Sequence, residues 1–439
     1  AVIGIVLIIT MLVVLLLKKD VIPARWLNTI AMMVTVVVIG YASYAAIVIR
    51  SSADTPMDQN SPDNVFSLKY YLNREQYGDT PLFYGQTYNA PVKLDVKGNM
   101  CVPVEKKGHA QYAPAPKAEG EKDRYVVTGY KNSYVYMDEF KMLFPRMHSA
   151  QAHHVDAYKS WANVKGKKVR YNYCGQNRTE DCPTFGENLK FFFRYQVNFM
   201  YWRYFMWNFA GRQNDIRSHG ELTKGNWISG IPFIDNAMLG DQSMLPTELR
   251  ENKGHNVYYF LPLILGLIGL FWQLGKRNNE GKNKDGYRSF AIVFLLFFLT
   301  GLAIVVYLNQ TPYQPRERDY AYAGSFYAFC IWIGLGVMAI VDSLNRLVKN
   351  EKAQTSFAVV AVLVALLVPA QMASQNWDDH DRSNRYSARD FGANYLKSCD
   401  EEAVIFCNGD NDTFPLWYNI EVEEERNDVR ACNLSYLQT

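Results

Sequence analysis

The six longest apolar runs of this 439-residue chain contain no Asp, Glu, Lys, Arg or His. Ion pathways and proton relays through a bilayer normally need ionisable groups at membrane depth. Their absence argues against an ion-coupled transporter. The runs are Ala1–Leu17, Thr29–Ile49, Asn256–Leu274, Ser289–Leu308, Ser325–Val341 and Thr355–Ala373.

The chain also has little net charge, +3 at pH 7, and no Lys/Arg-rich block. We therefore expect no nucleic-acid partner. None of the seven cysteines is spaced as a CxxC metal pattern. No Met and no basic leader precede the first apolar run, so a signal peptide does not fit and we expect an internal segment of a longer protein.

Apolar runs of about 17–25 residues are long enough to span a bilayer as helices. The sequence therefore predicts a polytopic α-helical membrane protein with about six spans. We expect a transmembrane hairpin over 1–50, a mixed α/β extracytoplasmic insert over 51–254 and four transmembrane helices over 255–374. The start of a C-terminal extracytoplasmic α/β domain then follows over 375–439.

Basic residues in short loops mark the cytoplasmic side. Lys/Arg-rich loops follow the first, third and fifth runs, so the insert, the loop at 309–324 and the tail share the outer side. Arg382, Arg385 and Arg389 count against this rule, but they lie among aspartates and begin a domain. Cys174 and Cys182 lie on that side, where disulfides persist. They form a bridge or remain two free thiols.

The segment Gly186–Ala210 is rich in Phe, Tyr and Trp but also carries Lys190, Arg194 and Arg203. We expect one or two helices in the outer membrane–water interface, where aromatic rings are favoured and long basic side chains reach toward water. The alternative is an aromatic shelf for a sugar or an isoprenoid chain. His153 and His154, near His148, are expected to be surface histidines.

The short outer loop between the fourth and fifth runs holds Arg316, Glu317, Arg318 and Asp319. Arginine suits bidentate phosphate binding. Arg316 and Arg318 are therefore candidates to hold the phosphate of a lipid-linked donor, with Glu317 and Asp319 orienting the guanidiniums or binding a metal. The alternative is an Arg–carboxylate network that locks the loop between helices.

A second cluster, Asp378, Asp379, His380, Asp381 and Arg382, follows the sixth run. Paired carboxylates can bind a divalent cation such as Mg²⁺ or Mn²⁺, and Asp379 and Asp381 are the candidate ligands. Helical spacing points these residues in several directions, so salt bridges and charge complementarity at a helix end are the alternative.

A third cluster follows a predicted buried strand over 402–407. Asp410, Asn411 and Asp412 there form a DxD-like turn after Gly409, and a helix from Phe414 and a strand over 428–434 complete a βαβ unit. Polar groups at the carboxyl end of such a strand are well placed to face a ligand. The alternative is an Asx-turn that caps the next helix.

Six segments together resemble one bacterial membrane-protein family labelled as a domain of unknown function. That family is similar to the eukaryotic transmembrane protein O-mannosyltransferases of the C-type glycosyltransferase superfamily. The segments are Met57–Asn60, Asn198–Asp215, Leu239–Ser243, Pro315–Phe329, Gln375–Ser383 and Asn408–Tyr418.

The resemblance implies a membrane glycosyltransferase in the bacterial inner membrane, with its large domains in the periplasm. It would move a sugar from a polyprenyl-phosphate donor to a protein or glycan acceptor. C-type enzymes carry a catalytic acid in the first outer loop, so that acid is expected upstream of Ala1 and no residue here is assigned to it. The rival hypothesis is a non-catalytic scaffold for cell-envelope assembly.

Overall fold

The computed structural model describes residues 23–53, 55, 58, 60–75, 78, 80–98, 100–115, 122, 124–275, 284–348 and 350–435. The chain divides into two compact units. Unit 1 comprises Ala1–Tyr201 and Leu299–Tyr322, and unit 2 comprises Trp202–Phe298 and Ala323–Thr439. Each unit is described by itself below.

Four helical segments are long and apolar enough to cross a membrane: Ala24–Ser51, Gly286–Leu308, Asp319–Leu347 and Glu351–His380. They correspond to four of the six expected spans. A fifth expected span, Ala1–Leu17, lies outside the described residues.

The span expected over Asn256–Leu274 is corrected by the structure. Asn256 and Val257 form a strand, and helix α9 begins only at Leu261 and ends at Gly275. Its 15 residues rise about 22 Å, less than the roughly 30 Å of a bilayer's hydrocarbon core. The backbone of Val257 pairs with Gly211, and this pairing takes the start of the apolar run out of the helix.

Helix α9 packs closely against helix α12 because glycines lie at the contact. A Cβ atom on Gly269 would overlap the backbone of Trp332, and one on Gly336 would overlap the backbone of Leu265. Small residues allow helix backbones to approach each other in this way. Trp332 also donates its indole N–H to Gln273 Oε1 over 2.8 Å, so a buried polar pair fixes the register of the two helices.

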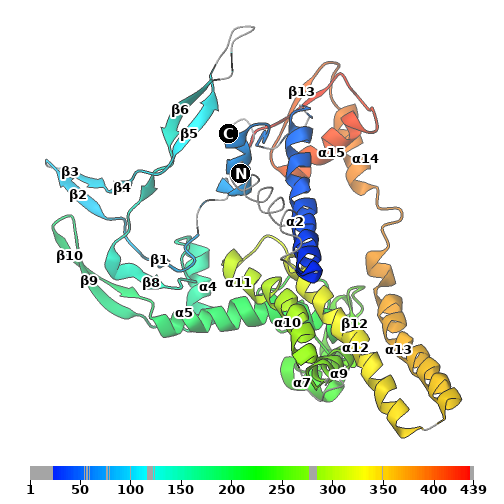
Figure 1. Cartoon of the computed structure of the whole chain (residues 1–439). Coiled ribbons are helices and arrows are strands. Elements are labelled where there is room, and N and C mark those ends of the chain that lie inside the picture. The colour runs from blue at the N-terminus through cyan, green and yellow to red at the C-terminus, as the bar shows by residue number, and fades with distance from the viewer. Residues whose placement is uncertain are drawn as a thin grey trace. The chain divides into compact units, whose positions relative to one another are not determined.

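Unit 1 contains several antiparallel two-stranded sheets, among them the hairpins β2–β3, β5–β6 and β9–β10, which appear as separate ribbons in Figure 1. Its helices are α2 (Ala24–Ser51), α3 (Val65–Leu72), η2 (Asp138–Phe140), α4 (Ala152–Ala162), α5 (Phe185–Phe191), the π-helical η3 (Phe192–Trp202), α11 (Leu302–Leu308) and η5 (Asp319–Tyr322). Its strands are β1 (Tyr84–Gln86), β2 (Leu94–Lys97), β3 (Met100–Pro103), β4 (Glu105–Lys106), β5 (Ala110–Pro114), β6 (Tyr125–Tyr130), β7 (Ser133–Tyr134), β8 (Lys141–Leu143), β9 (Lys167–Tyr173) and β10 (Gln176–Cys182).

The candidate Cys174–Cys182 bridge is wrong, and so is the alternative of two free thiols. Cys174 is bonded to Cys101, and Cys182 is a buried free thiol. Strands β9 and β10 form a tight hairpin in which Gln176 pairs with Tyr173 and Cys182 pairs with Lys167. Cys174 therefore lies at the turn and Cys182 at the far end of the strand, too distant for the close Cβ approach that a disulfide needs.

Unit 2 contains the apolar helices α9, α10, α12 and α13, an irregular polar segment and a small C-terminal α/β element. Its helices are α6 (Arg203–Phe209), α7 (Pro232–Leu239), η4 (Gln242–Met244), α8 (Thr247–Arg250), α9 (Leu261–Gly275), α10 (Lys284–Leu299), α12 (Ala323–Leu347), α13 (Glu351–His380), α14 (Ser387–Lys397) and α15 (Asp410–Glu421). Its strands are β11 (Gly211–Arg212), β12 (Asn256–Val257), β13 (Val404–Cys407) and β14 (Arg430–Asn433).

The βαβ unit at the C-terminus is confirmed. Strands β13 and β14 run parallel, and α15 connects them. The helix begins at Asp410 rather than at Phe414, because the two aspartates occupy its first turn, where they complement the helix dipole. Leu396 of α14 and Leu416 of α15 are buried in the apolar core of this element.

The aromatic segment forms three consecutive helices, α5, η3 and α6. In unit 2, Phe205 and Phe209 pack against Phe329 of α12, with ring centroids 4.9 and 4.6 Å apart. Since most of these rings are buried, the described residues leave no open aromatic shelf; Phe193 and Trp202 are the exposed aromatic side chains of the segment.

Candidate functional site

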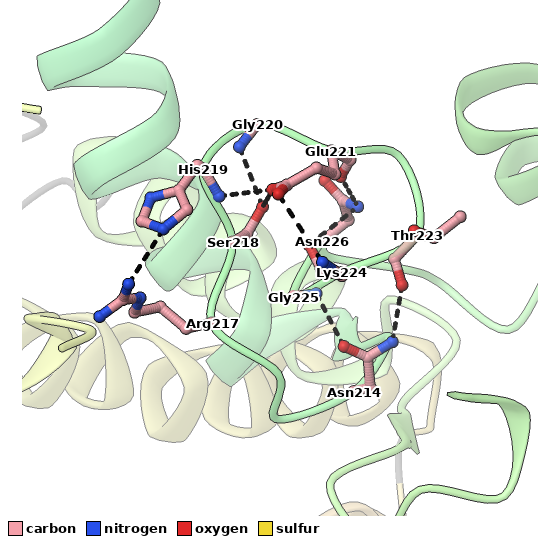
Figure 2. A network of polar contacts seen from close by, with 10 residues as sticks. All are labelled: Asn214, Arg217, Ser218, His219, Gly220, Glu221, Thr223, Lys224, Gly225 and Asn226. Carbon is pink, nitrogen blue, oxygen red and sulfur yellow. Dashed lines mark hydrogen bonds and ion pairs between the residues drawn. The ribbon is translucent and has the colours of Figure 1, made fainter. Parts of the chain in front are cut away.

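The loop Gly211–Ser229 of unit 2 is held in one conformation by its own buried amides (Figure 2). The fully buried Asn214 donates from Nδ2 to the carbonyl of Thr223 over 3.0 Å and accepts from the N–H of Gly225 over 2.8 Å. Gly225 has φ +54°, a left-handed conformation in which a side chain is disfavoured. These contacts close the loop into a defined turn.

Gln213 connects this loop to a second segment. Its Nε2 donates to the carbonyl of Leu222 and to Gln242 Oε1, the latter over 2.8 Å, while its Oε1 accepts from Asn226. The side chain is 1% exposed. Two of the segments that carry the family resemblance, Asn198–Asp215 and Leu239–Ser243, therefore meet at this residue.

Arg203 anchors the loop to α6. It is 3% exposed, and its Nη1 donates to the carbonyl of Gly225 over 2.7 Å. Its guanidinium also lies over the rings of Tyr204 and Trp207. The expectation that Arg203 reaches from the interface toward water is wrong, because a loop carbonyl and two aromatic rings take the place of water around it.

Charged groups remain at the surface of the loop. Figure 2 shows Glu221 facing the backbone N–H of His219, which donates to Oε2 over 2.6 Å, while Lys224 lies 3.8 Å from Oε1. Burial alone would raise the pKa of Glu221, but that hydrogen bond and the Lys224 cation lower it below its usual value. Arg217 lies 3.1 Å from His219 Nε2. The loop thus carries charged side chains of both signs, among them Arg217, Lys224 and Glu221.

The end of α13 docks on strand β12. Val257 donates its N–H to Gln375 Oε1 over 2.7 Å and accepts at its carbonyl from Gln371 Nε2 over 3.1 Å. The buried side-chain amide of Asn256 lies 3.1 Å from Asn376 Oδ1 and 3.4 Å from Asp379 Oδ2. We call the loop Gly211–Ser229, strand β12 and residues 371–379 of α13 the polar platform.

A buried phenol, Tyr258, lies directly beside the platform. Asn376 donates from Nδ2 to the hydroxyl of Tyr258 over 2.6 Å. Burial raises the pKa of Tyr258, and the nearby Asp379 carboxylate raises it further, although the Asn376 hydrogen bond acts in the opposite direction. The sequence analysis assigned no site role to Gln213, Asn214, Asn256 or Tyr258. For Gln213 and Asn214 a role could have been suspected, because both lie inside the long, specific motif Asn198–Asp215.

The side chains of the predicted acidic cluster after the sixth run point in different directions at the end of helix α13. Asp379 faces β12, whereas Asp378, His380, Asp381 and Arg382 are exposed. Asp381 leaves the helix and accepts at Oδ1 from the N–H of Ser383 over 2.8 Å. The hydrogen bonds from Ser383 hold the pKa of Asp381 below its usual value.

The described residues do not combine Asp379 and Asp381 into a metal site. No group of three or more His, Cys, Asp or Glu in the described part of the chain could hold a metal ion. Asp379 lies against the amide of Asn256, while Asp381 caps the next turn. The divalent metal therefore remains a prediction, and no step below uses one.

The predicted phosphate-binding loop lies in unit 1, where buried amides hold its first half. Asn309, 1% exposed, donates to the carbonyls of Pro81 and Pro145, and Gln196 donates to Asn309 Oδ1 and to the Gln310 carbonyl. Tyr195 donates to the Thr311 carbonyl.

The second half of that loop reaches the surface. Arg316 is exposed, with its guanidinium 5.7 Å from the ring centroid of Tyr320, while Glu317, Arg318 and Asp319 are partly buried. Arg316 is thus the cation that the loop presents to solvent. The predicted pocket shared with residues of the other unit stays a prediction.

At the βαβ unit, Asp410, Asn411 and Asp412 are exposed in the first turn of α15. The strand ends beside them are tied together by Ser435, which donates to Asn408 Oδ1, and by Asn433, which donates to the hydroxyl of Thr413. Gly409 has φ +94°, so the turn before the helix favours glycine. The two aspartates both complement the helix dipole and remain accessible to a ligand.

Of the two histidines expected at the surface, His153 is exposed but His154 is buried. His154 is 9% exposed and its Nδ1 lies 2.8 Å from Ser149 Oγ, while the partly buried His148 lies 3.4 Å from the carbonyl of Asn309. Burial lowers the pKa of both imidazoles. Only His153 is exposed among these three.

Comparison with known proteins gives two family matches. Residues 78–193 match a family of unknown function (DUF8416), and residues 388–439 match a TMEM260-associated domain 2. No curated protein and no solved structure matches the chain. The first match covers most of the hairpins of unit 1, and the second covers most of α14 and the whole βαβ unit of unit 2.

Proposed function

We propose that this chain is a segment of a membrane glycosyltransferase that moves a sugar from a polyprenyl-phosphate donor to a protein or glycan acceptor. The observation that carries the proposal is the match of residues 388–439 to a TMEM260-associated domain, because TMEM260 is a eukaryotic O-mannosyltransferase. The match falls on the C-terminal element for which the sequence resembles the transmembrane O-mannosyltransferases.

The side of the membrane is part of the proposal. Disulfides persist in oxidising compartments such as the bacterial periplasm, and the Cys101–Cys174 bridge supports an extracytoplasmic position for the insert. This orientation requires the 15-residue helix α9 to cross the membrane, which a short helix can do where the bilayer thins around it. The basic residues in short loops then support the same orientation. In this arrangement the chain belongs to the inner membrane, with the insert and the C-terminal element on the periplasmic side.

In the proposed mechanism, Arg316 binds the donor phosphate. The leaving phosphate of a glycosyl donor gains negative charge in the transition state, and a fixed cation stabilises that charge. Arg316 is exposed on a loop whose first half is anchored by buried amides. Arg318 is the second proposed phosphate ligand, and Glu317 and Asp319 would orient the two guanidiniums.

The polar platform and the βαβ unit are proposed to hold the acceptor. Exposed carboxylates, amides and basic groups at both places can form hydrogen bonds with the hydroxyls of a sugar or peptide. Asp378 belongs to the platform, His380 and Arg382 follow it in the chain, and Asp410, Asn411 and Asp412 lie at the strand ends. The catalytic base is not assigned to any of these residues.

The test is glycan transfer in membranes that carry the full-length protein with Arg316→Ala. We expect transfer to fall at least tenfold with normal protein levels, whereas Arg178→Ala, which removes an exposed arginine from hairpin β9–β10, leaves transfer unchanged. Unaltered glycans in the Arg316→Ala strain would remove this residue from the mechanism. Unaltered glycans in a strain that lacks the protein would favour the non-catalytic scaffold.

A further inference from the structure

A cavity of about 600 Å³ lies in unit 2 where helices α9, α12 and α13 meet. Its volume is within the range of ligand pockets, roughly 300–1,000 Å³. The lining is mostly apolar, and all of its residues except Trp272 belong to α12 and α13, which are long and apolar enough to cross a membrane. The lining residues are Trp272, Val337, Met338, Val341, Asp342, Asn345, Ala358, Val359, Val362 and Leu363.

The cavity is polar at the end of α12. Asp342 Oδ2 accepts from the indole N–H of Trp272 over 3.2 Å and pairs with Arg346 Nη2 over 2.8 Å. Asn345, one turn further on, has a buried Oδ1 that accepts no hydrogen bond from the described residues. A buried acceptor without a donor is costly, so this oxygen favours a ligand that brings an N–H or O–H group.

The polar end of the cavity lies at the depth in the bilayer where lipid headgroups are found. The span Asp319–Leu347 has 29 residues and rises about 43 Å, more than the roughly 30 Å hydrocarbon core. Asp342 and Asn345 lie in its last two turns, while the apolar wall extends toward the middle of the span. A ligand that follows this cavity therefore needs a polar head and an apolar chain.

The charges at this end select among lipids. Asp342 and Arg346 neutralise each other, so an anionic headgroup gains no net attraction there. The unsatisfied Asn345 oxygen needs a donor, which a choline headgroup cannot supply because it has no N–H. The headgroup must therefore carry no net negative charge and must supply an N–H donor. A primary ammonium beside a phosphate does both, with the ammonium near Asn345 and Asp342 and the phosphate near the exposed guanidinium of Arg346.

We propose that this cavity binds one aminophospholipid of the phosphatidylethanolamine type, with an acyl chain along α12 and α13. The apolar helices are the surfaces on which bilayer lipid would lie: none of the most apolar window of Glu351–His380 is buried inside the protein. The site is at the opposite end of α13 from the polar platform, so its role is separate from sugar transfer and does not depend on the proposed enzyme activity.

The test is native mass spectrometry of the full-length protein in detergent, titrated with lipids that have identical chains. We expect phosphatidylethanolamine to bind about tenfold more tightly than phosphatidylcholine, which is the effect of one hydrogen bond from a charged donor. Equal affinities would overturn the proposal. Tighter binding of phosphatidylglycerol than of phosphatidylethanolamine would also overturn it, because an anion would then be preferred.

Two variants locate the site. Asn345→Leu should abolish the preference for the ethanolamine headgroup without preventing lipid binding. Ala358→Phe should fill the cavity and reduce the binding of both lipids, whereas Ala370→Phe, the same change at an exposed position of α13 outside the lining, should not. Unchanged binding in Ala358→Phe would place the lipid elsewhere. The lipid comparison on the unmutated protein remains decisive if a variant fails to fold.

Discussion

Val257 and Gln375 are joined by a 2.7 Å hydrogen bond from the backbone N–H of the first to Oε1 of the second. Gln371, one turn earlier on α13, bonds to the carbonyl of the same Val257. Two helical side chains thus satisfy the free edge of a strand, a place where unpaired backbone groups would otherwise be exposed. This relationship ties the end of a long apolar helix to the polar platform.

Replacing Gln375 with Ala should loosen this docking. One hydrogen bond is lost, which costs about 1 kcal/mol of local stability. The amide of Val257 should exchange with solvent about fivefold faster, measured by hydrogen–deuterium exchange of a peptide that covers β12. Asp378→Ala, which changes an exposed residue of the same helix, serves as the control. Equal exchange in the two variants would contradict the docking role.

Replacing Gly336 with Ala should destabilise the pairing of α9 and α12. The added Cβ overlaps the backbone of Leu265, and overpacking of this kind costs about 1–3 kcal/mol. The measurement is the thermal unfolding temperature in detergent. Gly334→Ala is the matched control, because its Cβ meets no atom within 4 Å and alanine is the better helix former. A similar response of both variants would argue against the close contact.

The disulfide assignment can be tested by thiol alkylation under non-reducing conditions. Cys101→Ser should release the thiol of Cys174 for labelling in the unfolded protein, because the two form the bridge. Cys182→Ser should leave both Cys101 and Cys174 protected, because Cys182 is a free thiol. Labelling of Cys174 in the Cys182→Ser variant would restore the pairing that its sequence proximity suggested.

Unit 1 should lose stability as the pH falls below about 6.5, the ordinary pKa of histidine. Burial lowers the pKa of His148 and His154 in the folded state. Between the lowered folded-state pKa and the ordinary pKa, the unfolded chain binds protons that the folded chain does not. The free energy of unfolding therefore rises with pH in this window, and it reaches its full value above the ordinary pKa.

The corresponding measurement is urea unfolding of the protein between pH 5 and pH 8, monitored within unit 1. His154→Asn should flatten the pH dependence, whereas His153→Asn, which changes the exposed neighbour, should retain it. Stability that does not vary over this range in the unmutated protein would show that the buried imidazoles are not held neutral.

Some of the site could be predicted from residue types alone. Helical spacing implied that the Asp378–Arg382 cluster points in several directions, and only Asp379 faces β12. The roles of Gln213 and Asn214 were not predictable, because uncharged amides give no chemical signal until their partners are known. Gln213 finds its partners at Leu222, Asn226 and Gln242, which lie 9, 13 and 29 residues further along the chain.

The sequence by itself determined the apolar helices and the C-terminal βαβ unit, because length, hydropathy and strand–turn–helix patterning are local properties of the chain. The tertiary structure alone decided three features: the disulfide partner of Cys174, the late start of α9 and the buried position of Arg203. Each depends on a contact with a distant segment, namely Cys101, the strand partner Gly211 or the carbonyl of Gly225. Such contacts are set by packing in three dimensions and leave no periodic signal in the residues themselves.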